Sequence, residues 1–379
     1  MPRLLFVGSE DWLFALRHLP AVRAALELGL EPVVVAREHG HRRLIEEAGA
    51  RFIPFPMPMQ GWSPLRLWQQ AGALRRIIAD VNPVLLHLLG FRAACLGNAA
   101  AAMEQDPAAC ISAFKGFGPL VSRDDVVGTL LRWVTQIALT TIASRGGLLL
   151  FDNPDEGPFL GLSERAQQRA RLIKGQGIDP ILHGPEPMPW SPPLKLVFGS
   201  PLLWSNGPEL AVAAVGKLRA QGLDVSLSLI GAAFPPGRNA VPAETLSDWS
   251  RQPGIIWYGP TPDIAQVWRQ HHVLILPSRG GDGLPAILPQ AAAACRAIIT
   301  TDAAGCGSFV QDGIDGRVVP VGDVDALADA IALMARAPGL VERMGRAGRD
   351  KVLKGYAERD VMEALKALWR EELGMAVGA

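Results

Sequence analysis

The stretch of this sequence best suited to binding chemistry is a glycine-rich loop at residues 279–283, which reads Arg-Gly-Gly-Asp-Gly. It follows an apolar run typical of a buried strand and precedes a helix expected to begin after Pro285, a favourable residue in a first helical turn. Glycines let a backbone approach a ligand closely, and the free N–H groups of a helix N-terminus attract anions. The loop is therefore suited to a diphosphate, with Asp282 placed to hold sugar hydroxyls and Gln290 placed to reach a ribose. A tight strand-to-helix turn without a ligand is the alternative.

Metal-binding patterns are weak in this sequence. His271 and His272 are adjacent, so their side chains would point to opposite faces of an extended segment. The cysteines are scattered and lack a CxxC spacing; they are Cys95, Cys110, Cys295 and Cys306. We therefore expect neither a metal site nor a disulfide framework, and we interpret the cysteines as reduced thiols.

The composition argues against several classes of protein. Lys and Arg total 37, as do Asp and Glu, so the net charge is zero and no basic excess favours nucleic-acid binding. The N-terminal run Met-Pro-Arg-Leu-Leu-Phe-Val-Gly is typical of a strand and too short for a signal peptide. Residues 126–143 are nearly apolar but include Arg132 and Gln136, and they predict a buried core helix rather than a membrane span. We expect a cytoplasmic protein.

Two series of alternating strands and helices organise the chain. Short runs that are apolar throughout alternate with helical patterns, which is typical of a parallel sheet covered on both faces. Residues 179–193 contain six prolines and are interpreted as a linker, because proline removes a backbone donor and fixes φ. We predict an α/β protein with two doubly wound, Rossmann-like domains at 1–178 and 194–357, facing a central cleft. A C-terminal helix at 358–379 is expected to pack back towards the N-terminal domain.

The C-terminal half carries a recognisable signature. The glycine-rich loop continues as RGGDGLPAILPQAAAA, the next strand leads into TDAAGCG, and DGIDGRVVPVGDVDALADAI and RMGRAGRDKV follow. This run resembles the family 4 glycosyltransferases, in which a loop acid begins an E-x7-E pattern and a TD-x-x-G turn follows the next strand. The stretches GRNAVPAETLSDWSRQPGIIWYGPTPDI, NPVLLHLLGFRAACLG, KGFG and FDNPDE are similar to a subgroup that acts on polyprenyl-diphosphate-linked sugars in bacterial glycan assembly. The resemblance spans nearly the whole chain and implies the GT-B fold.

The resemblance places the nucleotide-sugar donor on the C-terminal domain. Asp282 stands at the acid that contacts the donor sugar, and Gln290 at the second acid, which binds the ribose. Where the family holds the diphosphate with an Arg and a Lys, this chain has Ser200 or Pro201 and Asn206, and Arg279 is the best-placed cation to compensate unless it is a solvated loop residue. The implied donor-binding residues are Gly199, Ser200, Asn206, Gly207, Tyr258, Arg279, Gly280, Gly281, Gly283, Leu284, Pro285 and Gln290.

The acceptor is expected on the N-terminal domain. Asp11 follows the first strand and either orients an acceptor hydroxyl or caps the next helix. His87 is expected at a strand end facing the cleft, with a packed, satisfied histidine as the alternative. Lys115 begins a basic turn that is suited to an acceptor phosphate. The catalytic candidates are Asp282, Asp11 and His87, and the acceptor-binding candidates are Trp12, Arg92, Lys115 and Gly116.

The family resemblance implies a retaining glycosyltransferase that uses a nucleotide-diphosphate sugar, with a UDP-sugar expected, and a lipid-linked or polysaccharide acceptor. It implies no metal and no cofactor. Arg and Trp side chains around the helix at 64–79 suit a membrane interface, so we expect peripheral contact with the inner face of the plasma membrane; a solvated helix face is the alternative. These residues are Trp62, Arg66, Trp68, Arg75 and Arg76. The alternative function is a degenerate, non-catalytic GT-B protein that serves as a ligand-binding or partner subunit, which the missing cations favour.

Overall fold

The structure is a computed structural model that describes residues 1–57, 64–104, 108–117, 125–189, 192–232, 239–261, 263–281 and 283–375. The chain divides into two compact units. The first comprises Met1–Phe117, Asp125–Gly177 and the C-terminal segment from Glu358, and the second contains Ile178–Ala357. Each unit has its own parallel sheet and its own hydrophobic core, and each is described separately.

A seven-stranded parallel sheet, in the order β3-β2-β1-β4-β5-β6-β7, forms the centre of the first unit. Its strands are β1 (Arg3–Glu10), β2 (Glu31–Arg37), β3 (Arg51–Pro54), β4 (Leu85–Leu89), β5 (Ala109–Phe114), β6 (Leu148–Phe151) and β7 (Ala170–Leu172). Its helices are α1 (Asp11–Arg17), α2 (Leu19–Glu27), α3 (Arg42–Glu47), α4 (Pro64–Val81), α5 (Phe91–Ala101), α6 (Val126–Ser144), α7 (Glu156–Phe159), α8 (Glu164–Gln168) and α15 (Glu358–Glu372). The strand order reverses between β1 and β4, which is where an open α/β sheet binds ligands, at the carboxyl ends of the strands.

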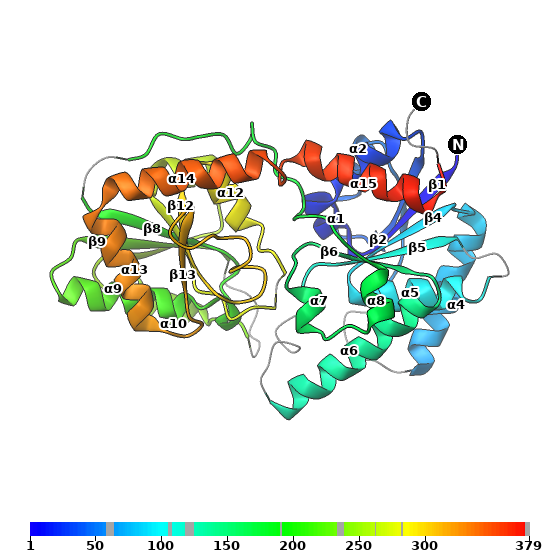
Figure 1. Cartoon of the computed structure of the whole chain (residues 1–379), viewed down its shortest axis with the longest axis horizontal. Helices are drawn as coiled ribbons and strands as arrows, with labels where there is room; N and C mark the ends of the chain where they lie inside the picture. The colour runs from blue at the N-terminus through cyan, green and yellow to red at the C-terminus, as the bar shows by residue number, and fades with distance from the viewer. Residues whose placement is uncertain are drawn as a thin grey trace. The chain divides into compact units, whose positions relative to one another are not determined.

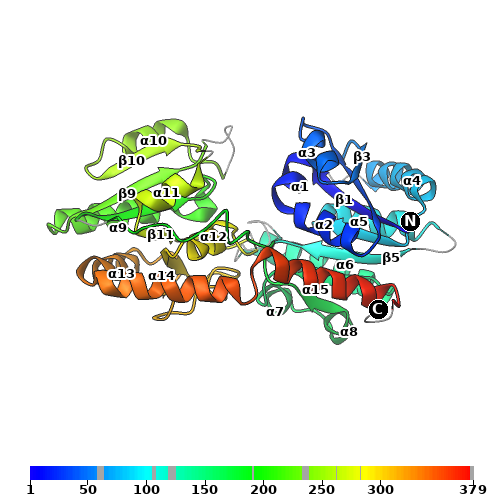
Figure 2. The same cartoon turned by 90° about the horizontal axis from the view of Figure 1, so that it is seen from above.

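The C-terminal helix belongs to the first unit. Helix α15 packs against α2, and the two lie side by side in both views (Figures 1 and 2). Lys366 on α15 forms an ion pair of 2.6 Å with Glu27 on α2, and Trp369 is fully buried against Phe6 of β1. The last helix therefore completes the core of the unit that the first strand begins.

In the second unit, a six-stranded parallel sheet has the order β10-β9-β8-β11-β12-β13. Its strands are β8 (Leu194–Gly199), β9 (Val225–Ile230), β10 (Ile255–Gly259), β11 (Val273–Leu276), β12 (Ala297–Thr301) and β13 (Gly316–Val319). Its helices are the 3₁₀ turn η1 (Trp204–Asn206), α9 (Pro208–Ala220), α10 (Ala243–Trp249), α11 (Ile264–Gln270), α12 (Ile287–Ala293), α13 (Val324–Arg336) and α14 (Pro338–Leu353). The switch point lies between β8 and β11.

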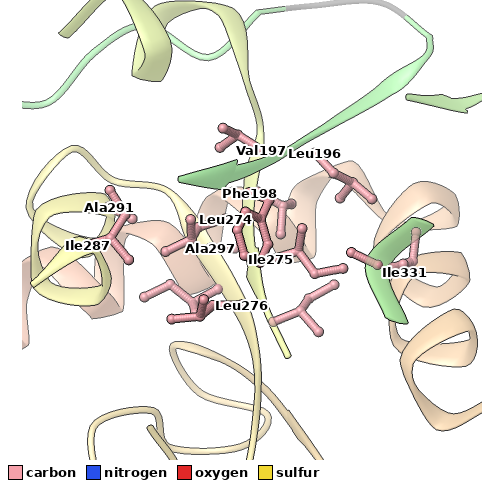
Figure 3. Packing of buried hydrophobic residues seen from close by; sticks show 14 of the residues in the cluster. Leu196, Val197, Phe198, Leu274, Ile275, Leu276, Ile287, Ala291, Ala297 and Ile331 are labelled. Carbon is pink, nitrogen blue, oxygen red and sulfur yellow. The ribbon is translucent and has the colours of Figure 1, made fainter. Parts of the chain in front are cut away.

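The central strands of the second unit are apolar on both faces because helices cover both. Phe198 of β8 and Leu274 and Ile275 of β11 pack with Ile287 of α12 on one side and with Ile331 of α13 on the other (Figure 3). All three strand residues are fully buried. The predicted α/β architecture of two doubly wound domains is thus confirmed in its main features.

The described part of the proline-rich linker at 179–193 is bound to the second unit. The guanidinium of Arg296 donates to the carbonyls of Glu186 and Pro187, each at 2.9 Å, and His272 Nε2 is hydrogen-bonded to the carbonyl of Pro189. Proline-rich backbone keeps its carbonyl acceptors even where it lacks N–H donors, and the side chains of Arg296 and His272 satisfy them here.

The expectation of a buried core helix at residues 126–143 is wrong. Helix α6 is the one helix in the described part of the chain that is long and apolar enough to cross a membrane, and only 28% of its apolar window is buried. Its exposed large side chains are Val126, Val127, Leu130, Trp133, Val134 and Ile137. At about 100° per residue these six fall within an arc of about 120°, so α6 presents one continuous apolar face to solvent.

Candidate functional sites

In the first unit, the switch point contains a cavity of about 140 Å³. Its wall is formed by the ends of β1, β4 and β5 and by α1, and it includes Glu10, Arg17, His18, Lys115 and the backbone of Gly116. A smaller cavity of about 40 Å³ shares Arg17, His18 and Lys115 and is also lined by residues of β4, β6 and α15. Sequence analysis located Lys115 and Gly116, and the structure adds Glu10, Arg17 and His18 to them.

Asp11 is a structural carboxylate and not an exposed base. The side chain is fully buried, and Oδ2 accepts hydrogen bonds of 2.8 Å from the backbone N–H groups of His39 and His41. Burial alone raises the pKa of this carboxyl, but these backbone hydrogen bonds outweigh it and hold the pKa below its ordinary value. Asp11 also does not cap α1, since the N-cap is Glu10. Asp11 therefore neither orients an acceptor hydroxyl nor caps the helix, the two roles that the sequence suggested. It instead fixes the loop after β2.

His87 lies in the middle of β4 rather than at its end, and it is buried. Its Nδ1 accepts a hydrogen bond of 3.2 Å from the indole N–H of Trp369, and its ring packs against that of Phe6 with 5.5 Å between centroids. Burial, reinforced by the nearby charge of Lys115, lowers the pKa of His87 to about 3. The imidazole is therefore neutral and packed, as in the alternative that the sequence left open.

Lys115 is half-buried at the wall of both cavities, just after β5. Burial lowers its pKa to about 7, and the charge of Asp152 only partly opposes this shift. Next to it, the backbone N–H of Gly116 donates to Glu156 Oε1 at 2.5 Å. Of the other acceptor-side candidates, Trp12 is 45% exposed on α1, and Arg92 is half-buried in the first turn of α5.

Glu156 is a site residue that sequence analysis missed. It follows the apolar strand β6 and is buried next to Asp152, and it holds the Lys115–Gly116 turn in place. Burial, followed by the charge of Asp152, raises the pKa of Glu156 to about 8. The signal was present in the FDNPDE run, where carboxylates come directly after a buried strand, the usual position for site residues in α/β folds.

Replacing Glu156 with glutamine should make the free energy of unfolding depend less on pH between about pH 4.5 and 8. Because the pKa of Glu156 is raised from 4.5 to about 8 on folding, its contribution to stability is fully present below about pH 4.5 and is lost as the pH rises to about 8. Glutamine keeps the acceptor for Gly116 and does not ionise. The free energy of unfolding of the wild type should therefore fall relative to that of Glu156→Gln between these pH values, measured by urea titration. Parallel curves for the two proteins would contradict the assignment.

In the second unit, two loops meet at the switch point. Gly207, with φ of +71°, lies so close to the end of β11 that a Cβ there would be 2.1 Å from the carbonyl oxygen of Pro277. Asn206 is buried and donates to Ser200 Oγ at 3.1 Å and to the carbonyl of Pro201 at 2.8 Å. Asn206 and Ser200 thus fix the loop at 199–207 to itself and against the strand that leads into the glycine-rich loop.

Arg279 connects the same two loops. Its guanidinium lies 2.5 Å from Glu209 Oε1 and donates to the carbonyl of Trp204 at 2.7 Å, and its backbone N–H donates to the carbonyl of Ser205 at 2.7 Å. The positive charge that the sequence suggested for a diphosphate is therefore already paired with a carboxylate. A ligand diphosphate would have to compete with Glu209 for it.

The glycine-rich loop is shaped by close backbone contact. Gly280, Gly281 and Gly283 all have positive φ, and a Cβ on Gly305 would lie 1.9 Å from the carbonyl oxygen of Gly283. Asp282, the principal catalytic candidate, lies outside the described residues. The other predicted donor residues differ in exposure: Gly199 and Gln290 are half-buried, Leu284 is buried, Pro285 is half-buried at the entry to α12, and Tyr258 is exposed on β10.

Within the described residues, no group of three His, Cys, Asp or Glu side chains could hold a metal ion. His271 Nε2 lies 2.7 Å from Ser228 Oγ and Nδ1 lies 2.7 Å from the carbonyl of Val267. His272 Nδ1 accepts from the backbone N–H of Lys195 at 2.9 Å. Both histidines, the weak metal candidates of the sequence, are therefore engaged in structural hydrogen bonds.

Comparison with known proteins gives a family match in the second unit. Residues 193–336 match the family model described as Glycosyl transferases group 1. A Salmonella typhimurium protein named as a colanic acid biosynthesis glycosyltransferase, WcaL, is 25% identical over 186 residues, which are 46% of this chain and 45% of that protein. The chain thus matches less than half of the length of this curated relative.

Solved structures match over almost the whole chain. A glycosyltransferase from Rickettsia africae has a TM-score of 0.76 at 15% identity, covering 99% of both chains. The Anabaena protein HepE, solved in complex with UDP-glucose, has a TM-score of 0.76 at 12% identity, covering 98% of this chain and 100% of that one. At these identities the likeness is one of fold.

Proposed function

We propose that this chain, which has the GT-B fold, is a group 1 glycosyltransferase. In this proposal it transfers a sugar from a nucleotide-diphosphate sugar to a saccharide or lipid-linked acceptor in cell-surface glycan assembly. The observation that carries the proposal is the construction of the switch point in the second unit. Gly207 against Pro277 and Gly305 against Gly283 hold two glycine-containing loops at the carboxyl ends of β8 and β11. Close backbone contact of this kind leaves room and N–H groups for a ligand.

The proposed donor is a UDP-sugar, with transfer that retains the anomeric configuration and needs no metal or cofactor. The fold match to a protein solved with UDP-glucose supports a UDP-sugar, and the name of the Salmonella typhimurium relative supports polysaccharide synthesis. In this proposal Asp282 contacts the donor sugar, and Gln290 binds the ribose as a neutral donor and acceptor.

The charges around the donor loops support a weak diphosphate clamp. Asn206 and Ser200 bond to each other, and Arg279 is bound to Glu209. A charge-assisted hydrogen bond is worth roughly 1.5–3 kcal/mol. A diphosphate held mainly by backbone N–H groups would therefore bind more weakly, and would be a poorer leaving group, than one held by charged side chains. These pairings also favour the second candidate function, a GT-B subunit that binds a nucleotide sugar or a partner without transfer.

Calorimetry with UDP-, GDP- and ADP-sugars tests the donor assignment. We expect one UDP-sugar to bind, and Asp282→Ala should lower turnover by at least about 100-fold, because the acid acts where charge develops. Asp248→Asn, on α10, is the matched control and should behave as wild type. Absence of binding for every sugar nucleotide up to millimolar concentration would refute the transferase, and binding without turnover would select the second candidate.

Peripheral contact with the cytoplasmic face of the membrane is part of the proposal for a lipid-linked acceptor. On α4, Trp68 is 68% exposed, but Arg75 is paired with Glu104 at 2.8 Å. Trp62 lies outside the described residues, and so does the side chain of Arg66. On α6, six large apolar side chains are exposed, and flotation with anionic vesicles measures whether the chain binds them.

A further inference from the structure

We infer that the cavity in the first unit is an anion-binding site that seats a phosphoryl group on Lys115, Arg17 and His18. The inference deepens the proposed function, because it assigns an acceptor that carries a phosphoryl group, but its first test needs no transfer reaction. The cavity lies at the switch point, at the carboxyl ends of β1, β4 and β5, where ligands of such sheets bind.

The ammonium group of Lys115 is the central observation. Within the described part of the chain, it forms no hydrogen bond and has no carboxylate within ion-pair distance. Asp152 is near enough to act on its charge but does not pair with it directly. Lys115 is half-buried at the cavity wall, so an anion in the cavity could pair directly with its ammonium group.

The surrounding charges are arranged for an anion. Arg17 and His18 line both cavities with Lys115, whereas His87 lines only the smaller one. The pKa values of both histidines are lowered by burial first and then by the charge of Lys115. Each nearby carboxylate has at least one contact with another group, although the second oxygen of Glu156 is buried without a hydrogen-bond partner in the described part of the chain. Glu10 Oε2 lies 2.9 Å from His39 Nε2, Asp152 Oδ1 accepts from Asn153 at 3.1 Å, and Glu156 accepts from Gly116.

The backbone around the cavity leaves room for a phosphoryl group. Gly8, Gly90 and Gly116 line it, and Gly90 begins the eleven-residue helix α5. By the same measure of volume a single water needs about 10–15 Å³, so a cavity of about 140 Å³ can hold a tetrahedral anion with several waters. The N–H of Gly90 itself donates to the carbonyl of Ala113 and is not available.

Binding should depend on pH with a defined sign. Burial lowers the pKa of Lys115 to about 7, so its cationic form is lost as the pH rises above 7. A phosphoryl group is already dianionic there, because its second pKa is about 6. The groups that interact with Lys115 electrostatically are Arg17, His18, His87 and Asp152. Glu156, which accepts from the adjacent Gly116, also titrates in this range, because its pKa is raised to about 8. Both changes lower anion affinity between pH 7 and 9.

Calorimetry on the full chain with inorganic phosphate tests the site. We expect binding that weakens at least about tenfold in Lys115→Gln and between pH 7 and 9 in the wild type, while Lys115→Arg retains binding because it keeps the charge. Arg76→Gln, an exposed arginine on α4 of the same unit, is the matched control and should bind as wild type. Equal phosphate affinity in wild type and Lys115→Gln would overturn the inference, as would no binding by the wild type at tens of millimolar.

Two further ligands distinguish the sources of the phosphoryl group. Glycerol phosphate represents a soluble acceptor, and short-chain phosphatidate represents a lipid headgroup; each should bind in a Lys115-dependent way if it reaches the site. Phosphatidate binding that is unchanged in Lys115→Gln would show a different, non-specific lipid contact and would count against the assignment. If no sugar nucleotide binds but phosphate does, the proposed sugar transfer is refuted, whereas the anion site is supported.

Discussion

Replacing Gly305 with alanine is expected to reduce the proposed sugar transfer by about 100-fold. Gly305 has φ of +81°, and an added Cβ would lie 1.9 Å from the carbonyl oxygen of Gly283 and 2.5 Å from its carbonyl carbon. Both neighbours are backbone atoms, so no rotamer change can relieve the collision, and the glycine-rich loop must move. A displacement of about 1 Å in a positioning loop can reduce turnover by about 100-fold. Donor-dependent turnover and calorimetry with the donor measure the loss.

Gly313→Ala separates this collision from simple backbone strain. Gly313 has a similar φ of +77°, but nothing lies within 4 Å of its Cβ position. Alanine there costs only the left-handed conformation, roughly 1–2 kcal/mol, and should leave donor binding unchanged. If Gly305→Ala and Gly313→Ala reduce turnover equally, the contact between Gly305 and Gly283 does not position the donor loop.

This contact illustrates which part of the donor site could be predicted from the sequence. The TD-x-x-G turn and the glycine-rich loop are local patterns, and their positions after β12 and β11 follow from two apolar runs of strand length. The family match over residues 193–336 includes both patterns. The sequence did not reveal that Gly305, the glycine of the TD-x-x-G turn, lies against Gly283 and lets the glycine-rich loop approach closely.

The pairing of charges could not be predicted for a related reason. Arg279 and Glu209 lie 2.5 Å apart in space but belong to different strand-to-helix connections. Asp11 likewise accepts hydrogen bonds from His39 and His41, which follow the neighbouring strand β2. Side chains that meet at a sheet edge come from strands that pair only in three dimensions, so sequence distance gives no warning that a candidate charge is already satisfied.

The burial of side chains was also predicted wrongly, since one residue expected at the cleft is buried and one helix expected in the core is exposed. His87 seemed to be a strand-end residue, yet β4 continues to Leu89 and a helix from the far end of the chain covers it. Helix α6, in contrast, was expected in the core because it is apolar, but it exposes its largest side chains. Hydrophobicity indicates that a side chain prefers to be covered, and only the tertiary arrangement determines what covers it.

Replacing Trp369 with alanine is expected to destabilise the first unit by about 3–5 kcal/mol, the usual cost of deleting a large buried aromatic side chain. Trp369 is fully buried, packs edge-on against Phe6 and His87, and lies on the helix that returns from the end of the chain. The loss should appear as a lower midpoint in urea unfolding. Trp369→Phe should recover most of the packing but leave His87 Nδ1 without its donor, at a cost of about 1–3 kcal/mol.

Trp68→Ala is the matched control, because Trp68 is 68% exposed and its removal should change stability by less than about 0.5 kcal/mol. The titration of His87 gives a second readout. Its pKa is lowered from 6.5 to about 3 on folding, so the stability it contributes is present above pH 6.5 and lost as the pH falls towards 3. In Trp369→Ala, water reaches the imidazole and its pKa should rise towards 6.5, which nuclear magnetic resonance can follow. Equal stability of the two tryptophan variants, with an unchanged His87 titration, would mean that α15 is not part of the core of the first unit.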